Sequence, residues 1–275
     1  MLRRKTEIDW LVETEQMDGQ SVNEMVLGEV HRWLGLRSRP GGAPLRITEL
    51  GCGIGGNRRR LSQGLTAPQH WTMVEFNPDV AEYFRKQFKI DADDTTDLVC
   101  PQEDAAINCA RHVDGADLLI LSGRSATLPQ PALLDVLAKA RQQGTAVYAA
   151  LQPTGFVKFE PESTDDQPIH QMVSASGMPQ AAALIEAMEE AGFRVLKGES
   201  DWIVQGVNES FWHSRGRKLQ RHFLQRYLGA ARRNHPDQAA GLLAWANKRS
   251  VLIERKKTTI TVGHADILAI PEDRE

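Results

Sequence analysis

The stretch ITELGCGIGGN, residues 47–57, decides which fold the sequence predicts. An apolar segment, residues 45–50, runs into a turn that is rich in glycine. Glycine lets the backbone adopt positive φ angles and lets a ligand approach the chain closely. We expect a helix from about Asn57, so the stretch predicts a strand, a ligand-binding turn and a helix in that order. The glycines of the turn are Gly51, Gly53, Gly55 and Gly56.

A second informative residue, Glu75, lies 20 residues after Gly55. It follows the short apolar segment 71–74, which we expect to be the next strand. A carboxylate at the end of that strand can accept hydrogen bonds from both hydroxyls of a ribose. Together, the glycine turn and Glu75 predict a site for a nucleotide cofactor.

The glycine spacing fits two kinds of nucleotide-binding protein. One subset of the glycines matches the dinucleotide fingerprint G-x-G-x-x-G, and another matches E/D-x-G-x-G-x-G, the signature that opens class I S-adenosylmethionine (SAM) methyltransferases. Glu49 favours the second, because this family has an acid at the end of the first strand that helps to receive the aminoacyl part of SAM. In a dehydrogenase that position is usually apolar. The chain therefore resembles the class I SAM-dependent methyltransferases.

Later segments follow the strand order that this resemblance implies. Residues 117–122 (DLLILS) and 144–152 (GTAVYAALQ) are typical of buried parallel strands, and they would be the fourth and fifth. A short third strand is expected at 97–100. The resemblance covers residues 45–152. Further on, the segments GESDWIV and GHADILAIP resemble a group of bacterial methyltransferases whose acceptor the sequence does not indicate.

The resemblance implies SAM as the cofactor and indicates which residues bind it. Asp104, in the loop after the third strand, is similar in placement to the acid that contacts the adenine amino group, although Glu103 is adjacent and leaves the choice open. The expected SAM-binding residues are Glu49, Gly51, Cys52, Gly53, Gly55, Asn57, Glu75, Phe76, Asp104 and Ser122.

Composition limits the classes of function. The 275 residues are 41% apolar with a net charge of -3, which favours a globular protein and gives no global attraction to nucleic acid. Three cysteines without C-x-x-C spacing predict a reduced protein. No segment approaches the roughly 18 to 20 apolar residues of a membrane span, and no signal peptide is evident. We expect a cytoplasmic protein without a metal site, and the sequence leaves its oligomeric state open.

Helices are expected on both sides of the core. Residues 24–34 have apolar residues at helical spacing. The resemblance implies that such preceding helices cover the SAM site, and the alternative is a helix that simply packs on the sheet. Residues 153–179 indicate a long loop or a short hairpin, before a helix at 178–191 and a strand at 193–196. Two helices divided near 234–236 are expected within 208–247, before a last strand at 266–270.

We therefore expect a Rossmann-like class I methyltransferase fold, a mostly parallel seven-stranded α/β sheet with helices on both faces and a helical insertion between the last two strands. Four segments are predicted. They are an N-terminal helical cap (1–44), a SAM-binding core (45–205), the helical insertion (206–257) and a strand that completes the sheet (258–275).

The insertion holds the strongest charge feature of the chain. Aromatic residues interleaved with basic ones could stack bases while the basic residues bind phosphates. Alternatively, the aromatics pack inward and the basic stems cover a solvated face. We favour the second interpretation because the net charge is negative. The basic residues between positions 210 and 236, where no acid occurs, are Arg215, Arg217, Lys218, Arg221, Arg226, Arg232 and Arg233.

The sequence favours a small-molecule acceptor. The segment SGRSATLP after the fourth strand lacks the [DNS]-P-P-[YF] pattern that binds an exocyclic amine in many nucleic-acid methyltransferases. Methyl transfer can rely on positioning, so we assign no catalytic residue. Arg124, His170 and Trp202 follow or flank strand ends and are candidate substrate contacts. An RNA (tRNA or rRNA) methyltransferase and a non-catalytic nucleotide-binding Rossmann module remain alternatives.

Overall fold

The computed structural model of the chain describes residues 7–38, 41–89, 95–100, 109–122, 128–174, 181–206 and 211–272, with the backbone alone for 211–215. The chain divides into two compact units. Unit 1 contains Met1–Gln152, Pro179–Ser200 and Ala265–Glu275, and unit 2 contains Pro153–Met178 and Asp201–His264. Asp104 and Arg124 lie outside the described residues.

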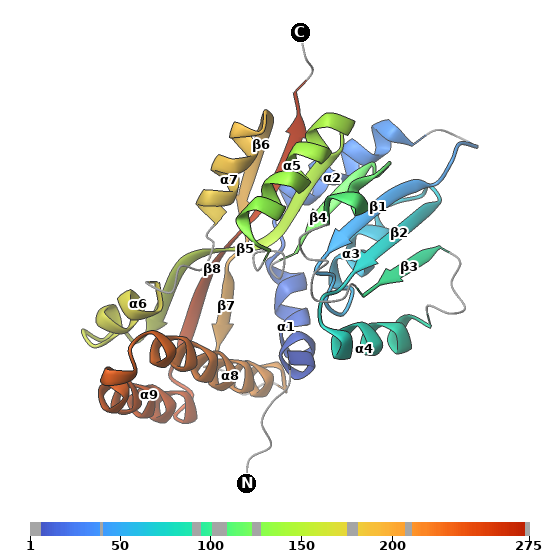
Figure 1. Ribbon diagram of the computed structural model, residues 1–275. Helices are drawn as coiled ribbons and strands as arrows, with labels where there is room; N and C mark the ends of the chain where they lie inside the picture. Colours follow the sequence, from blue (N-terminus) through green and yellow to red (C-terminus); the bar gives the residue numbers. More distant parts are fainter. Residues whose placement is uncertain are drawn as a thin grey trace. The chain divides into compact units, whose positions relative to one another are not determined.

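The sheet has the Rossmann-like arrangement that the sequence predicted. Its strands have the order β3-β2-β1-β4-β5-β8-β6, and β7 pairs with β8 (Figure 1). The first five strands pair in parallel, whereas β6 and β7 run antiparallel to β8. The strands are β1 (Leu45–Leu50), β2 (Gln69–Val74), β3 (Thr96–Val99), β4 (Leu118–Leu121), β5 (Ala146–Glu160), β6 (Phe193–Glu199), β7 (Trp202–Gln205) and β8 (Thr259–Pro271).

The sheet has eight strands and not the seven expected. The additional strand is β7, whose residues alternate between buried and exposed and pair with Val262 to Thr259 of β8. Strand β8 is longer than the expected 266–270 because it pairs with both β6 and β7. These pairings join segments far apart in the sequence, so local sequence patterns gave little indication of them.

Helices cover both faces of the sheet in unit 1. Buried side chains of α2 (Glu24–Arg37), α3 (Gly56–Gln63) and α4 (Pro78–Phe88) pack in one core cluster with Ile47, Ile120 and Tyr148. Those of α5 (Gln130–Gln143) and α7 (Ala181–Glu190) pack in the second cluster with alternate residues of the same strands. Because both faces are buried, the central strands are apolar throughout.

The order of the strands determines where a ligand can bind. Strand β1 pairs with β2 on one side and with β4 on the other, so Ile47 lies opposite both Trp71 and Leu118. Strands β2 and β3 therefore lie on one side of β1, and the strands from β4 onward lie on the other. In open α/β sheets, ligands bind at such a switch point, outside the carboxyl ends of the strands. This edge of the sheet carries the residues that follow Leu50, Val74 and Leu121.

Unit 2 contains the three helices α6 (Asp166–Ser174), α8 (Phe211–Asn234) and α9 (Ala239–Glu254). The predicted division of the last two is confirmed, since α8 ends at Asn234. The loop expected over 153–179 is wrong in part, because β5 continues to Glu160 and α6 follows it. Strand β5 lies beside β8 in the sheet, and this long-range partner explains a strand at residues where Pro153 and Gly155 suggested a loop.

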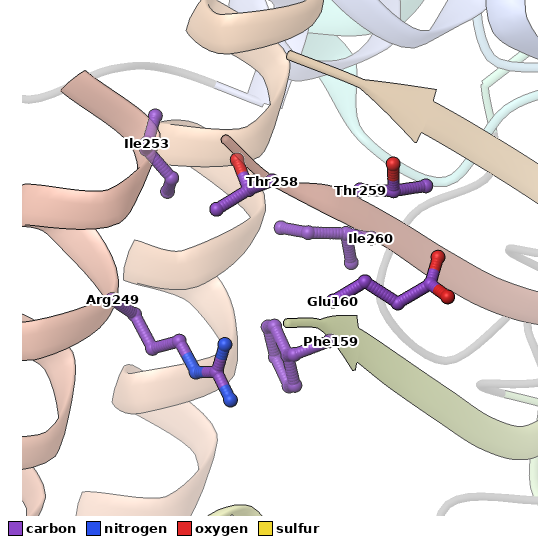
Figure 2. A pocket seen from close by; sticks show the side chains of 7 residues that line it. All are labelled: Phe159, Glu160, Arg249, Ile253, Thr258, Thr259 and Ile260. Atoms are coloured by element: carbon purple, nitrogen blue, oxygen red, sulfur yellow. The ribbon is translucent and has the colours of Figure 1, made fainter. Parts of the chain in front are cut away.

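Aromatic rings form the core of unit 2. The ring centroids of Phe159 and Trp245 are 5.4 Å apart, and those of Phe159 and Tyr227 are 5.7 Å apart. The buried Arg249 forms an ion pair with Asp166, and its guanidinium carbon lies 5.2 Å from the centre of the Phe159 ring. Figure 2 shows Arg249 reaching from α9 toward Phe159 at a small pocket. A charged side chain thus takes part in this core only because it is paired.

Candidate cofactor site

The turn after β1 has the backbone conformation that its glycines predicted. Gly51, Gly53 and Gly55 have φ angles of 72°, 56° and 77°. The amide N–H groups of Gly51 and Cys52 both donate to the Val74 carbonyl, at 2.8 and 3.0 Å, and so tie the turn to the end of β2. A Cβ atom at Gly55 would lie 2.5 Å from the Phe84 ring. Glycine at position 55 is therefore required by both the backbone angle and the packing of α4.

Glu75 lies at the carboxyl end of β2 and is fully buried. Its Oε2 accepts a hydrogen bond from the Gly53 amide at 2.8 Å, and its Oε1 accepts one from the Asn77 amide at 2.9 Å. Asn77 in turn caps α4, so one carboxylate fixes the glycine turn and the start of that helix. A carboxylate has about four acceptor positions and can bind the hydroxyls of a ligand as well.

Glu49 is 1% exposed and only half satisfied. Its Oε1 accepts a hydrogen bond from Asn57 Nδ2 at 2.8 Å, whereas its Oε2 has no hydrogen-bond partner in the described part of the chain. Burial raises the pKa of Glu49 to about 8, and the Asn57 hydrogen bond and the charge of Arg60 oppose that rise. Buried polar atoms without a partner are rare, and a buried carboxyl with a raised pKa is typical of a functional site.

The helix α1 (Glu7–Ser21) covers the glycine turn within unit 1. The Leu11 side chain would lie 3.7 Å from a Cβ atom at Gly53, and Glu15 forms an ion pair with Arg59 of α3. Whether the helices before the core cover a bound cofactor stays a prediction.

The sequence reasoning missed three polar residues at this edge, namely Asp266, Tyr148 and Arg60. Asp266 of β8 is fully buried and accepts hydrogen bonds from the Leu151 and Asn23 amides, both at 2.7 Å, and from the Tyr148 hydroxyl. Burial raises the pKa of Asp266. Arg60 of α3 donates to Asn57 Oδ1, and its charge lowers the pKa of both Asp266 and Glu49.

One signal could have revealed Arg60. The first two turns of α3 contain three consecutive arginines and no acid, although the positive end of a helix dipole disfavours cations. Asp266 had no comparable signal, because the donors that it binds come from residues more than 100 positions away in the sequence.

The structure brings most of the expected cofactor residues together. Ser122, after β4, donates its hydroxyl to the carbonyls of Leu50 and Gly51 and so joins the ends of β1 and β4. Cys52 is buried in the turn, and Phe76 packs against the core beside Val74. The turn itself contains Gly51, Gly53 and Gly55, and the side chains of Glu49, Asn57 and Glu75 lie beside it.

The candidate substrate residues His170 and Trp202 lie in unit 2. His170 Nδ1 is 2.8 Å from the Tyr227 hydroxyl, and the Trp202 ring is 4.8 Å from that of His264. Their role as substrate contacts stays a prediction. Among the residues with described coordinates, no cluster of metal ligands occurs, and no helix has the length and apolar character needed to cross a membrane.

Neither a family model nor a curated protein matches this sequence. Similar solved structures share little sequence with it. YjhP from E. coli is 16% identical over 94% of this chain and 99% of its own, with a TM-score of 0.45. YcgJ from Bacillus subtilis is 11% identical over 92% of this chain and 100% of its own, with a TM-score of 0.48. Precorrin-6y C5,15-methyltransferase from Geobacter metallireducens is 11% identical over 90% of this chain and 87% of its own, with a TM-score of 0.45.

Proposed function

We propose that this protein is a SAM-dependent methyltransferase that transfers a methyl group to a small molecule. The observation that carries the proposal is the pair of buried carboxyl groups on either side of the glycine turn. Glu49 has a buried oxygen without a partner among the described residues, and Glu75 directly follows the neighbouring strand β2. A ligand with a cationic amine at one end and a ribose at the other would complement both.

Each end of the site has a distinct task in this proposal. Glu75 accepts hydrogen bonds from the ribose hydroxyls, while Gly53, without a side chain, lets the nucleoside approach the backbone. Glu49 accepts a hydrogen bond from the α-ammonium group. The sulfonium of SAM supplies the methyl group. The protein residues fix its direction relative to the acceptor, and positioning of this kind can account for much of the rate.

A small-molecule acceptor is supported by the way α8 packs within unit 2. Leu219, Leu224 and Tyr227 are buried, so one aromatic residue of the basic run belongs to the core of unit 2. Of the exposed basic residues, Arg221 forms an ion pair with Glu254 at 2.7 Å. This pattern is that of an amphipathic helix with a solvated basic face. Submicromolar tRNA binding at physiological salt would favour the RNA methyltransferase instead.

Calorimetric titration of the purified protein with S-adenosylhomocysteine (SAH) and with NAD tests the proposal. We expect SAH to bind and NAD not to bind. Charged hydrogen bonds from ribose hydroxyls contribute about 1.5 to 3 kcal/mol each, so Glu75→Ala should weaken SAH binding by about tenfold or more. Because Glu75 also accepts from the Gly53 and Asn77 amides, circular dichroism of Glu75→Ala checks that the loss does not come from misfolding.

The matched control is Glu82→Ala, since Glu82 lies on the next helix, α4, and forms ion pairs with Lys86 and Arg85 at the surface. Its SAH affinity should equal that of the wild type. Unchanged affinity in Glu75→Ala, or tight binding of NAD, would contradict the proposed cofactor.

A further inference from the structure

Three side chains near the glycine turn form a continuous polar group, which we call the Glu49–Asn57–Arg60 triad. Asn57 is 7% exposed and joins the other two. Its Nδ2 donates to Glu49 Oε1 at 2.8 Å, and its Oδ1 accepts a hydrogen bond from Arg60 Nη2. Asn57 therefore holds the carboxyl group of Glu49 and the guanidinium of Arg60 at fixed positions, although these two groups do not bond to each other.

Arg60 differs from the two arginines that precede it on α3. Arg58 donates to Thr96 Oγ1 at 2.8 Å and lies over the Phe88 ring, and Arg59 pairs with Glu15. Arg60 has no ion pair with any carboxylate in the described ranges. Arg58 and Arg59 thus have partners outside the triad, whereas Arg60 donates to Asn57 within it, and its charge acts on Glu49 and Asp266.

The guanidinium of Arg60 lies beside the first turn of α3. A Cβ atom at Gly56 would be 3.3 Å from Arg60 Nη1, so the absence of a side chain at Gly56 leaves room for it there. Gly55, the N-cap residue, provides no side-chain cap, and the first turn contains no acid. Backbone N–H groups at a helix N-terminus favour an anion, and a guanidinium beside them favours a carboxylate.

Glu49 Oε2 provides the complementary half. It is a buried acceptor without a partner, and Oε1 of the same carboxyl group is bonded to the Asn57 side chain that also contacts Arg60. An acceptor for an ammonium group and a donor for a carboxylate therefore lie on either side of one asparagine. An α-amino acid carries these two charged groups on one carbon atom.

We propose that Arg60 binds the α-carboxylate of the cofactor while Glu49 Oε2 accepts from its α-ammonium, so that the triad selects a nucleoside with an intact amino acid. Arg60 is then a specificity-determining residue, and this inference rests on the proposed function. It deepens that proposal by assigning a third residue, which lies outside the glycine signature.

Binding of two nucleosides tests the inference. SAH carries the amino acid, whereas 5′-methylthioadenosine has the same adenosine and sulfur without it. We expect Arg60→Met to weaken SAH binding by about 10- to 100-fold, as for the loss of a charged hydrogen bond, and to leave the affinity for 5′-methylthioadenosine unchanged. Arg60→Lys, which keeps the charge, should lose less. Arg58→Met is the matched control on the same helix and should bind both ligands as the wild type does.

The possible results separate the inference from the proposed function. Equal losses for both nucleosides in Arg60→Met would overturn the inference, because they would indicate a structural role for Arg60. Unchanged SAH binding in Arg60→Met would overturn it as well, while the proposed function would stand. A wild-type protein that binds neither nucleoside would overturn both.

Discussion

Replacing Glu49 by glutamine should stabilise the empty protein at alkaline pH and weaken its binding of SAH. Glutamine keeps an oxygen that can accept from Asn57 Nδ2 but does not ionise. In the wild type, burial raises the pKa of Glu49 from 4.5 to about 8. The native state therefore binds this proton more tightly than the unfolded chain does. The contribution of Glu49 to stability is full below about pH 4.5 and is lost as the pH rises through about 8.

The size of the effect follows from the same shift. A change in pKa from 4.5 to about 8 corresponds to at most about 5 kcal/mol, at about 1.4 kcal/mol for each tenfold change in proton affinity. If the variant gains about half of this upper bound, its free energy of unfolding rises by roughly 2 to 3 kcal/mol. Such a gain would raise the Tm of a chain of this size by about 4 to 12 °C. At pH 5 both proteins carry an uncharged side chain at position 49, so their Tm values should nearly coincide.

Thermal unfolding followed by circular dichroism from pH 5 to pH 9 measures this difference. Subtracting the wild-type Tm from that of Glu49→Gln removes the contribution of every other titrating group. We expect the difference to grow with pH, while calorimetry shows SAH affinity reduced by about tenfold or more because a neutral amide replaces the charged acceptor. A difference that does not vary with pH, or a variant that binds SAH normally, would refute the reasoning.

Two further substitutions test the packing on which the site and unit 2 depend. Gly55→Ala should destabilise the protein by roughly 1 to 3 kcal/mol, because position 55 has φ 77° and the new Cβ would meet the Phe84 ring at 2.5 Å. Chemical denaturation should show no such loss in Gly28→Ala, where nothing lies within 4 Å. Arg249→Met leaves Asp166 without its buried partner and should cost about 3 to 5 kcal/mol, whereas Lys248→Met, at the exposed pair with Asp165, should change stability by less than about 1 kcal/mol. Equal losses in Arg249→Met and Lys248→Met would contradict this account of the unit 2 core.

The fold and the centre of the site could be predicted because their signals are local in the sequence. Glu49 and the glycines of the turn lie within a few residues of one another, and Glu75 follows one helix and one strand later. A βα turn of this kind forms from neighbouring residues, so its spacing in the sequence determines its geometry. The order of the first five strands was expected from the resemblance that this turn carries, and the sheet has that order.

The features that were missed depend on contacts between distant segments. Strand β7 exists because β8 pairs with it, and β5 continues past Pro153 beside the same strand. Asp266 is satisfied by amides of residues 23 and 151, which no spacing rule connects to position 266. The role suggested for Arg60 depends on its side chain folding back toward Gly56, and the sequence shows only an unusual run of arginines there.

A crystal structure of the protein with SAH would test the central claim most directly. The account predicts the ribose hydroxyls within hydrogen-bonding distance of the Glu75 carboxylate and the α-ammonium group within hydrogen-bonding distance of Glu49 Oε2. SAH bound elsewhere, or bound at the glycine turn with Glu49 Oε2 still lacking a partner, would contradict it.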